Sequence, residues 1–378
     1  MSKAPGPWHS RFSPLAYIWH RMTGDSILYT HNLFKKYGPI VRVRPDMVVI
    51  CDDQVWDEVL RMGSNFHKAE FHERMRIGSD RFLFSITDVR QHAARRRLFA
   101  RALTMDALRR NWEAQVRVKV DTAVDQIRLE AAGGVADIFK WWRLMTADVI
   151  ALLSFGDSFN MVETAGEGER EYFDALVNAG LNIVLRDLFP FLPLLTRILP
   201  FQKLRDIVNA DHVVTEKGDT AVRNLRSTGA GRPNLFSNML AEAEKAQAGE
   251  KEGSVLTDDA VRSEVAGFLM AGSDTTGFAM TMITWVVLRK PQLQRQLEEE
   301  VAGLSDNFTD KDVEKLPLLN SVIDEAMRMY NPAGGGMHRK APPEGATFLG
   351  HYLPGGTNII VQHYSIARDS KLFPDPDR

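Results

Sequence analysis

The stretch from Thr257 to Lys290 constrains the fold of this chain more than any other. Thr257 is a good N-cap, and the two aspartates that follow it place negative charge where the helix dipole is positive. Arg289 and Lys290 supply positive charge at the other end, and Pro291 cannot continue a helix. The apolar residues between these ends suit a helix that is buried on much of its surface. The stretch therefore predicts one central helix of roughly 30 residues, which at ~1.5 Å per residue crosses a whole domain.

The middle of this predicted helix consists of residues that form helices poorly. Residues 271–277 read A-G-S-D-T-T-G and contain two glycines, three hydroxyl side chains and a carboxylate, all less favourable in a helix than alanine. Ala271, Gly272 and Thr275 share one face with Phe268, because they stand three, four and seven positions from it. That face is nearly flat, so a planar ligand could lie on it. Such a local conflict is expected at a functional site.

Two polar residues of this segment suggest proton chemistry. The Thr275 hydroxyl can donate to a carbonyl one turn earlier, which bends a helix and opens room for O2 or water. Asp274 would be costly to bury without a partner, so a role in proton transfer is one interpretation. The alternative is that the small residues let a second helix cross closely and that Asp274 reaches solvent.

Composition and charge narrow the functional classes. The chain has 378 residues, a net charge of −2 and a pI near 6.6, so nothing in its charge favours binding to nucleic acid. The single cysteine, Cys51, excludes an internal disulfide and suits a reducing compartment. No run of residues approaches the ~18 apolar positions of a transmembrane helix. As written, the chain is expected to be soluble and cytosolic.

Short β-strands are predicted near both ends of the chain. Residues Ile40 to Arg44 alternate apolar and charged side chains, and Met47 to Cys51 return after a Pro-Asp turn. Phe348 to Leu353 and Thr357 to Val361 flank a Pro-Gly-Gly turn and are predicted to pair as a hairpin. Cys51 ends its strand as a small core residue and not as a metal ligand.

A basic helix from Val89 to Leu103 carries the next candidate site. His92 and Arg96 stand four positions apart, so they lie on one face and could donate together to a pair of carboxylates. Arg95 and Arg97 are either solvated or part of a docking surface for an acidic partner.

Two further segments have more than one interpretation. Glu325 and Arg328 stand three apart in a helix predicted from Leu318 to Tyr330, a spacing that allows an ordinary ion pair. Leu181 to Phe201 is the most apolar region, but three prolines deny it a continuous helix. It is either an exposed loop suited to an oily substrate or a membrane surface, or a buried connection between helices.

Four segments together resemble the cytochrome P-450 superfamily, the haem-thiolate monooxygenases. A-G-S-D-T-T at 271–276 resembles the oxygen-binding signature of its central helix, and L-P-L-L-N-S-V-I-D-E-A-M-R-M-Y-N-P at 316–332 resembles its E-x-x-R helix. K-Y-G-P-I-V-R-V at 36–43 resembles the entry to its small β-sheet, and L-F-P-D-P-D-R at 372–378 resembles the segment before its haem-binding loop. The motifs follow the order of the family, and their wording is most similar to fungal members that act in secondary metabolism.

The resemblance implies a mainly α fold with a small β-sheet, formed by residues 1–378 as a single domain without the family's N-terminal membrane anchor. Haem is the implied cofactor, and proton delivery to its bound oxygen is the implied role of the polar segment. The residues that the resemblance assigns are Asp274 and Thr275 as catalytic, His92, Arg96 and Arg339 on the haem propionates, Ala271 and Gly272 beside the haem, and Glu325 and Arg328 as structural support.

The implied reaction inserts one oxygen atom from O2 into a C–H or C=C bond of a small apolar substrate. A separate flavoprotein reductase is the expected partner and supplies electrons from NADPH. In the family, the region that matches Leu181 to Phe201 covers the substrate entrance and can touch the membrane, so a peripheral membrane contact is expected there. If a full-length parent carries an anchor, the implied location is the cytosolic face of the endoplasmic reticulum membrane.

The sequence as given stops before the family's haem-binding loop, so the axial cysteine is expected beyond Arg378 and no metal ligand is predicted within the chain. On this basis the fold is expected to be C-terminally incomplete. The main alternative to a working monooxygenase is therefore a truncated non-catalytic scaffold, or a pseudoenzyme, that lacks the haem thiolate. A third interpretation is an all-α protein unrelated to haem. It is rejected if the strands near Val41 and Ile359 join one sheet beside the long helix.

Overall fold

The structure is a computed structural model that describes residues 4–77, 80–166, 169–189, 234–237 and 257–377, with further single positions between 192 and 241. The chain divides into two compact units. The sheet unit comprises Met1–Arg74, Val184–Pro190 and Met327–Arg378, and the helical unit comprises Met75–Ile183 and Phe191–Ala326. The expected single domain over residues 1–378 stays a prediction. Most of the apolar region beyond Phe189 lies outside the described residues.

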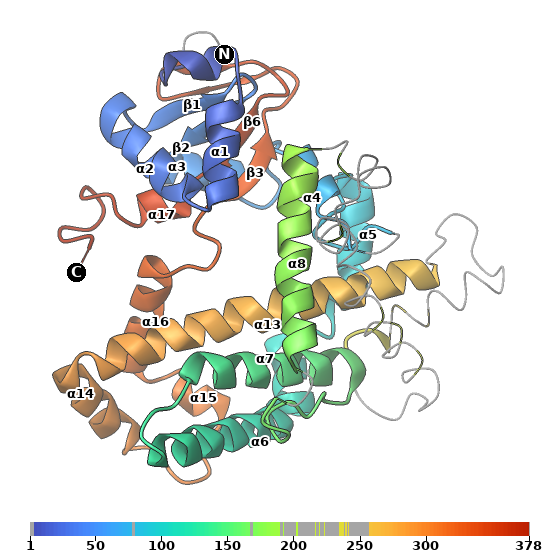
Figure 1. The fold of residues 1–378 in the computed structure, drawn as a ribbon, viewed down its shortest axis with the longest axis vertical. Coiled ribbons are helices and arrows are strands. Elements are labelled where there is room, and N and C mark those ends of the chain that lie inside the picture. Colours follow the sequence, from blue (N-terminus) through green and yellow to red (C-terminus); the bar gives the residue numbers. More distant parts are fainter. Residues whose placement is uncertain are drawn as a thin grey trace. The chain divides into compact units, whose positions relative to one another are not determined.

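Four short strands form the main sheet of the sheet unit (Figure 1). In spatial order they are β1 (Ile40–Arg44), β2 (Met47–Ile50), β6 (Asn358–Val361) and β3 (Met337–Lys340). β1 pairs with β2 and β3 pairs with β6 in antiparallel fashion, whereas β2 and β6 are parallel. The strands near Val41 and Ile359 therefore share one sheet, which an all-α protein does not contain.

The predicted hairpin between Phe348–Leu353 and Thr357–Val361 is wrong. Instead, β4 (Ala346–Phe348) and β5 (His351–Leu353) form a separate two-stranded sheet. Leu349 and Gly350, which join these strands, both have positive φ, 51° and 78°, as a two-residue type I′ turn requires. The apolar strand after the Pro-Gly-Gly turn is β6, and it is buried in the main sheet.

Helices surround the sheet and account for most of the rest of the sheet unit. α1 has an unusual distribution of side chains, because Leu15, Trp19 and Met22 are exposed while Tyr17 is buried. The helices of this unit are η1 (Trp8–Arg11), α1 (Leu15–Thr23), α2 (Ser26–Tyr37), α3 (Asp53–Leu60), α4 (Glu70–Arg74) and α17 (His363–Ile366).

The helical unit is arranged around α13 (Asp258–Leu288), which confirms the predicted central helix almost to the residue. The Thr257 hydroxyl accepts from the Ala260 backbone N–H at 3.1 Å, as its predicted role of N-cap requires. The other described helices are α5 (Val89–Ala100), α6 (Met105–Ala132), α7 (Ile138–Phe155), α8 (Glu169–Leu188), α14 (Pro291–Val301), α15 (Asp310–Val313) and α16 (Pro317–Met329).

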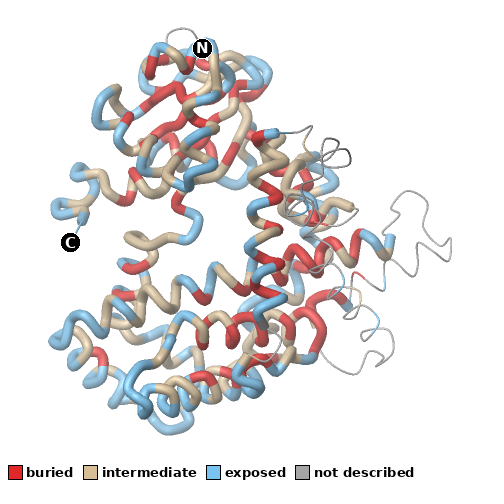
Figure 2. Tube along the Cα trace, viewed as in Figure 1, coloured by how far each residue is buried: buried red, intermediate tan, exposed pale blue. Residues whose placement is uncertain are grey.

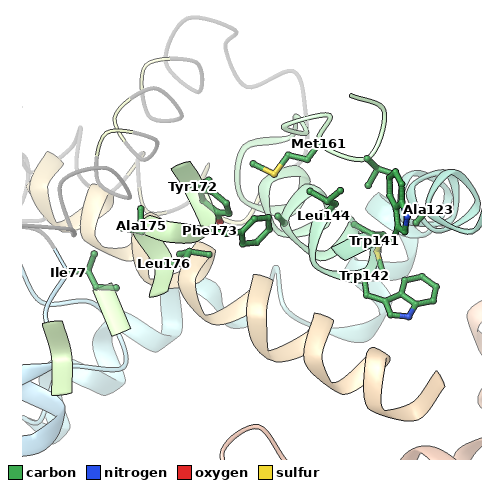
Figure 3. Packing of buried hydrophobic residues seen from close by; sticks show 14 of the residues in the cluster. Ile77, Ala123, Trp141, Trp142, Leu144, Met161, Tyr172, Phe173, Ala175 and Leu176 are labelled. Carbon is green, nitrogen blue, oxygen red and sulfur yellow. The ribbon is translucent and has the colours of Figure 1, made fainter. Parts of the chain in front are cut away.

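Two apolar clusters cover α13 within the helical unit. One joins Phe99 of α5 to Val261, Val265 and Leu269 of α13. The other contains Trp141 and Trp142 of α7 and Tyr172 and Phe173 of α8, which Figure 3 shows together with their neighbours. As a result, α13 is buried along its N-terminal half and becomes more exposed after Met270 (Figure 2).

Candidate active site

An open stripe begins in the middle of α13 at the unusual segment. Ala271, Thr275 and Phe278 are exposed at offsets of four and three, whereas Ser273 and Gly277 on the other side are buried. The Thr275 hydroxyl donates to the Ala271 carbonyl at 2.7 Å, which confirms the predicted bond to the preceding turn. Because its hydrogen is engaged there, the Thr275 oxygen is left as an acceptor at the open surface.

Glycines on the other side of α13 permit close contact with α7. A Cβ atom on Gly272 would lie 2.7 Å from Cγ1 of Ile150, and one on Gly277 would lie 3.1 Å from Cα of Arg143. The close crossing of a second helix therefore explains why these two positions are glycine. The expected place of Gly272 beside the cofactor stays a prediction.

Asp274 is held by a residue that sequence reasoning missed. Arg143 of α7 donates from Nε to Oδ1 of Asp274 at 2.8 Å, and its guanidinium lies 3.9 Å from the ring centroid of Phe173. The Asp274 side chain remains 39% exposed, so it contacts both solvent and a fixed cation. The two residues are 131 positions apart, and no local pattern links them.

A second group behind the open face consists of buried hydroxyls. The Thr146 hydroxyl donates to the Ser273 carbonyl at 2.7 Å, and the Ser273 hydroxyl donates to the Leu269 carbonyl at 2.9 Å. Tyr172 therefore donates to Ser273 Oγ, at 3.0 Å, and burial raises the pKa of Tyr172 above its usual range. These bonds fix the unusual segment of α13 against α7 and α8.

The basic helix α5 is capped by Asp88, whose side chain accepts from the Gln91 N–H at 2.8 Å. His92 is half-buried and Arg96 is exposed, and their spacing places both on one face. Arg95 is neither solvated nor free for docking, contrary to both interpretations of the sequence. It donates to the fully buried Glu264 at 2.8 Å, because α5 packs with this side toward α13.

Arg339 in β3 forms no ion pair with the residues that the structure describes. Its Nη1 donates to the His338 carbonyl at 3.0 Å, and no carboxylate among the described residues pairs with it. Partial burial lowers the pKa of Arg339, so an anionic ligand would stabilise the charge. Within the sheet unit, this arrangement suits the carboxylate of an anionic ligand such as a haem propionate.

Arg328 of α16 anchors the C-terminal segment of the sheet unit. Its Nη1 donates to the Pro376 carbonyl at 2.9 Å and to the Ala367 carbonyl, and its guanidinium lies 4.5 Å from the ring centroid of Phe373. Glu325 is exposed, and its predicted pairing with Arg328 stays a prediction.

Cys51 does not fit the role of a haem ligand. Burial raises the pKa of its thiol to about 12, whereas the ligand that binds a metal is the thiolate. Among the described residues, no three His, Cys, Asp or Glu side chains gather where they could hold a metal ion.

The mainly helical fold, the small mixed sheet and the long helix with its open Ala271–Thr275 face are consistent with the haem-monooxygenase class. The sequence matches the cytochrome P-450 family over residues 5–378, and the chain belongs to that family.

Curated relatives carry the same assignment. The chain is 34% identical to the cytochrome P-450 monooxygenase aflV of Aspergillus parasiticus, over 100% of this chain and 74% of the relative. It is 35% identical to the cytochrome P-450 monooxygenase tazI of Aspergillus terreus, over 100% of this chain and 76% of the relative. It is 31% identical to the methylphloroacetophenone oxidase of Cladonia uncialis, over 99% of this chain and 83% of the relative. The chain is therefore a haem-dependent monooxygenase, and nothing favours the non-catalytic alternative.

Proposed function

We propose that this chain inserts one oxygen atom from O2 into a C–H or C=C bond of a small apolar molecule, as a step of fungal secondary metabolism. The open face of α13 carries the proposal, because the small side chains of Ala271 and Thr275 are exposed where the buried N-terminal half of the helix ends. NADPH supplies the electrons through a separate flavoprotein reductase, and the second oxygen atom leaves as water. The names of the fungal relatives support the reaction class.

Within this proposal, different residues bind the propionates of haem, contact its ring and support the fold. Haem supplies the iron that binds and activates O2. Cationic donors would hold its two propionates, and small residues of α13 would leave room for its ring. The assignments are His92, Arg96 and Arg339 for the propionates, Ala271 for the plane, and Glu325 and Arg328 for support of the fold. Gly272 lies against Ile150 of α7 and allows the two helices to pack closely.

Proton delivery is assigned to Thr275 and Asp274. The Thr275 oxygen accepts a hydrogen bond at the open face, because its own hydrogen is directed to the Ala271 carbonyl. Asp274 is partly exposed, so it can contact water from the solvent, while Arg143 fixes its direction. In this proposal, the Thr275 oxygen orders water at the open face, and Asp274 is the acid that passes protons to that water.

Replacement of Thr275 by alanine tests the proton role. In the haem-loaded protein, Thr275→Ala is expected to keep consuming NADPH while releasing more peroxide, because oxygen is reduced without an ordered proton donor. The matched control is Thr281→Ala, which removes another back-bonded hydroxyl of α13, directed to the Gly277 carbonyl at 2.7 Å. Product formed per NADPH should fall in the first variant and not in the second. Equal coupling in all three proteins would reject the assignment.

We infer that the protein works at the cytosolic face of the endoplasmic reticulum membrane. Among the described residues, no helix is both long and apolar enough to cross a bilayer. Support comes from the apolar stripe, a term used here for Trp8, Phe12, Leu15, Trp19 and Met22. Each of these side chains is between 56% and 78% exposed.

The chemistry of the apolar stripe favours a lipid surface as its partner. Two of its five residues are tryptophans, which prefer the boundary between apolar chains and water. Residues 4–37 contain four Lys or Arg side chains and one aspartate, although the whole chain has a net charge of −2. This local excess of positive charge attracts anionic headgroups. An inserted stripe with a cationic surround is the arrangement of a peripheral membrane protein.

A further inference from the structure

Glu264 is an acid in the fully buried part of α13. Its side chain is 0% exposed, and Oε1 accepts from Nη1 of Arg95 at 2.8 Å. The Arg95 side chain is itself only 14% exposed. Removing both charges from water is costly, and apolar residues of similar volume usually serve stability equally well. The pair therefore calls for an explanation beyond packing.

The surroundings of Glu264 come from two segments. Arg95 reaches it from α5, and Asp80 and Leu83 lie in the loop that precedes α5. Burial raises the pKa of Glu264 to about 7 and Asp80 adds to this, while the Leu83 backbone amide and Arg95 oppose it. The same loop is fixed to α13, because the Asp80 N–H donates to Ser263 Oγ at 3.3 Å.

Arg95 lies on the face of α5 that carries the candidate haem-binding residues. His92, Arg95, Arg96 and Phe99 stand at offsets of zero, three, four and seven, so they form one continuous strip. Phe99 is buried in the apolar cluster with α13. Arg95 and Phe99 thus attach two successive turns of α5 to α13, and this attachment determines the direction in which His92 and Arg96 project.

We propose that Glu264 is a positioning residue for the haem propionates: through Arg95 it fixes the rotation of α5 about its axis, so that His92 and Arg96 donate together to the same anionic group. The inference rests on the proposed roles of His92 and Arg96. Glu264 also keeps Arg95 directed away from the ligand, since its guanidinium is engaged in the interior.

Comparison of haem with its dimethyl ester separates positioning from a general effect on folding, because the ester lacks the carboxylates. Glu264→Gln is expected to weaken haem binding by the ligand-free chain on the order of tenfold, as losses of a supporting partner commonly do. Binding of the ester should be unchanged. The matched control is Glu163→Gln, which removes another paired carboxylate of the helical unit, the partner of Lys119 at 2.6 Å. Absorbance titration gives all the affinities.

The pH dependence has a defined sign. Glu264 is mostly ionised above pH 7 and mostly neutral below it, so its hydrogen bond with Arg95 is charge-assisted on both sides only at the higher pH. The ratio of the affinity for haem to the affinity for the ester is therefore expected to decrease as the pH is lowered from 8 to 6. In Glu264→Gln the preference for haem over the ester should change less between these two pH values than in the unsubstituted chain. In Glu163→Gln it should change as much as in the unsubstituted chain.

Each other outcome overturns the proposal. If Glu264→Gln lost affinity for haem and for the ester equally, the role of Glu264 would be structural alone. If Glu264→Gln bound haem more tightly, Arg95 itself would contact the propionates. If the unsubstituted chain bound neither ligand, or both equally, the proposed propionate site would fail. Hydrogen exchange of the ligand-free chain tests the positioning step separately. The α5 amides must exchange faster in Glu264→Gln than in Glu163→Gln, and equal rates would reject the step.

Discussion

At the scale of single residues, the candidate site depends on partners from distant parts of the sequence. Asp274 belongs to a recognisable motif, but its direction is set by Arg143, which lies between the rings of Phe139 and Phe173 at 5.0 and 3.9 Å from their centroids. An arginine held by two aromatic rings and a carboxylate has few alternative positions. The acid of the motif is therefore more constrained than its exposure suggests.

The stability of the protein should report this constraint. Arg143→Met removes an ion pair and two ring contacts, so the free energy of unfolding is expected to fall by about 1–2 kcal/mol. Arg170→Met is the control, because Arg170 is 95% exposed and lies 4.0 Å from Asp174 on the surface of α8; its effect should stay within about 0.5 kcal/mol. Urea unfolding at neutral pH measures both, and similar values for the two variants would contradict the argument.

At the scale of elements, the sequence of α13 reflects its contacts with α7 and with the loop before α5 as much as its proposed role in ligand binding. Gly272 and Gly277 face α7, and Gly267 faces the loop that carries Phe82. A Cβ atom on Gly267 would lie 2.3 Å from Cδ2 of Phe82 and 2.9 Å from its Cγ, so the whole ring would have to move. The loop before α5 is thus seated directly on the backbone of α13.

Substitution of Gly267 by alanine should therefore destabilise the protein, although alanine favours helices by ~1 kcal/mol. We expect a net loss of about 1–2 kcal/mol from the displaced ring. Gly180→Ala is the matched control in α8, because a Cβ atom there meets nothing within 4 Å; it should be neutral or stabilising. Combining Gly267→Ala with Phe82→Ala should cost less than the sum of the single changes. Strict additivity in thermal unfolding would show that no clash exists.

The limits of prediction are also clearest among the elements. The ends of α13 were predictable, since they depend on the capping and charged residues at each end of the helix. The pairing of β4 with β5 was not, because residues Phe348 to Leu353 are predicted from the sequence as one strand, and a leucine with positive φ at position 349 is uncommon. Arg143, Tyr172 and Glu264 were missed for a different reason. Their roles arise from contacts across the fold, which leave no periodic pattern.

At the scale of the whole molecule, the proposed function places the protein at a lipid surface through its apolar stripe. The five exposed side chains are confined to the first 22 residues and accompany a local excess of positive charge. Large exposed apolar side chains that gather in one segment indicate an interaction surface more strongly than isolated ones do. An oily substrate concentrated in the membrane would then be available to the enzyme at its place of work.

Vesicle binding tests this assignment with the chain as it is. The protein is expected to sediment with vesicles of phosphatidylcholine and phosphatidylserine, and less with phosphatidylcholine alone, because anionic lipid attracts its cationic residues. Trp19→Glu should reduce binding at least about tenfold, since a charge replaces an exposed ring that is expected to insert among the lipids. Met62→Glu is the control, because Met62 is 89% exposed but lies outside the stripe. Absence of binding, or an equal loss in both variants, would reject a lipid surface; concentration-dependent dimerisation abolished by Trp19→Glu would identify a second copy as the partner instead.

The parallel pairing of β2 with β6 has a consequence for how the protein is made. Asp46 and Asn358 form a side-chain hydrogen bond across 312 positions of the sequence, and Val48 lies opposite Ile359 in the sheet. During synthesis on the ribosome, β2 cannot pair with β6 until almost all of this chain has been made. Contacts at such separation form slowly. The nascent hairpin therefore spends translation with an unpaired edge, while the helical unit has all of its residues before the sheet can close.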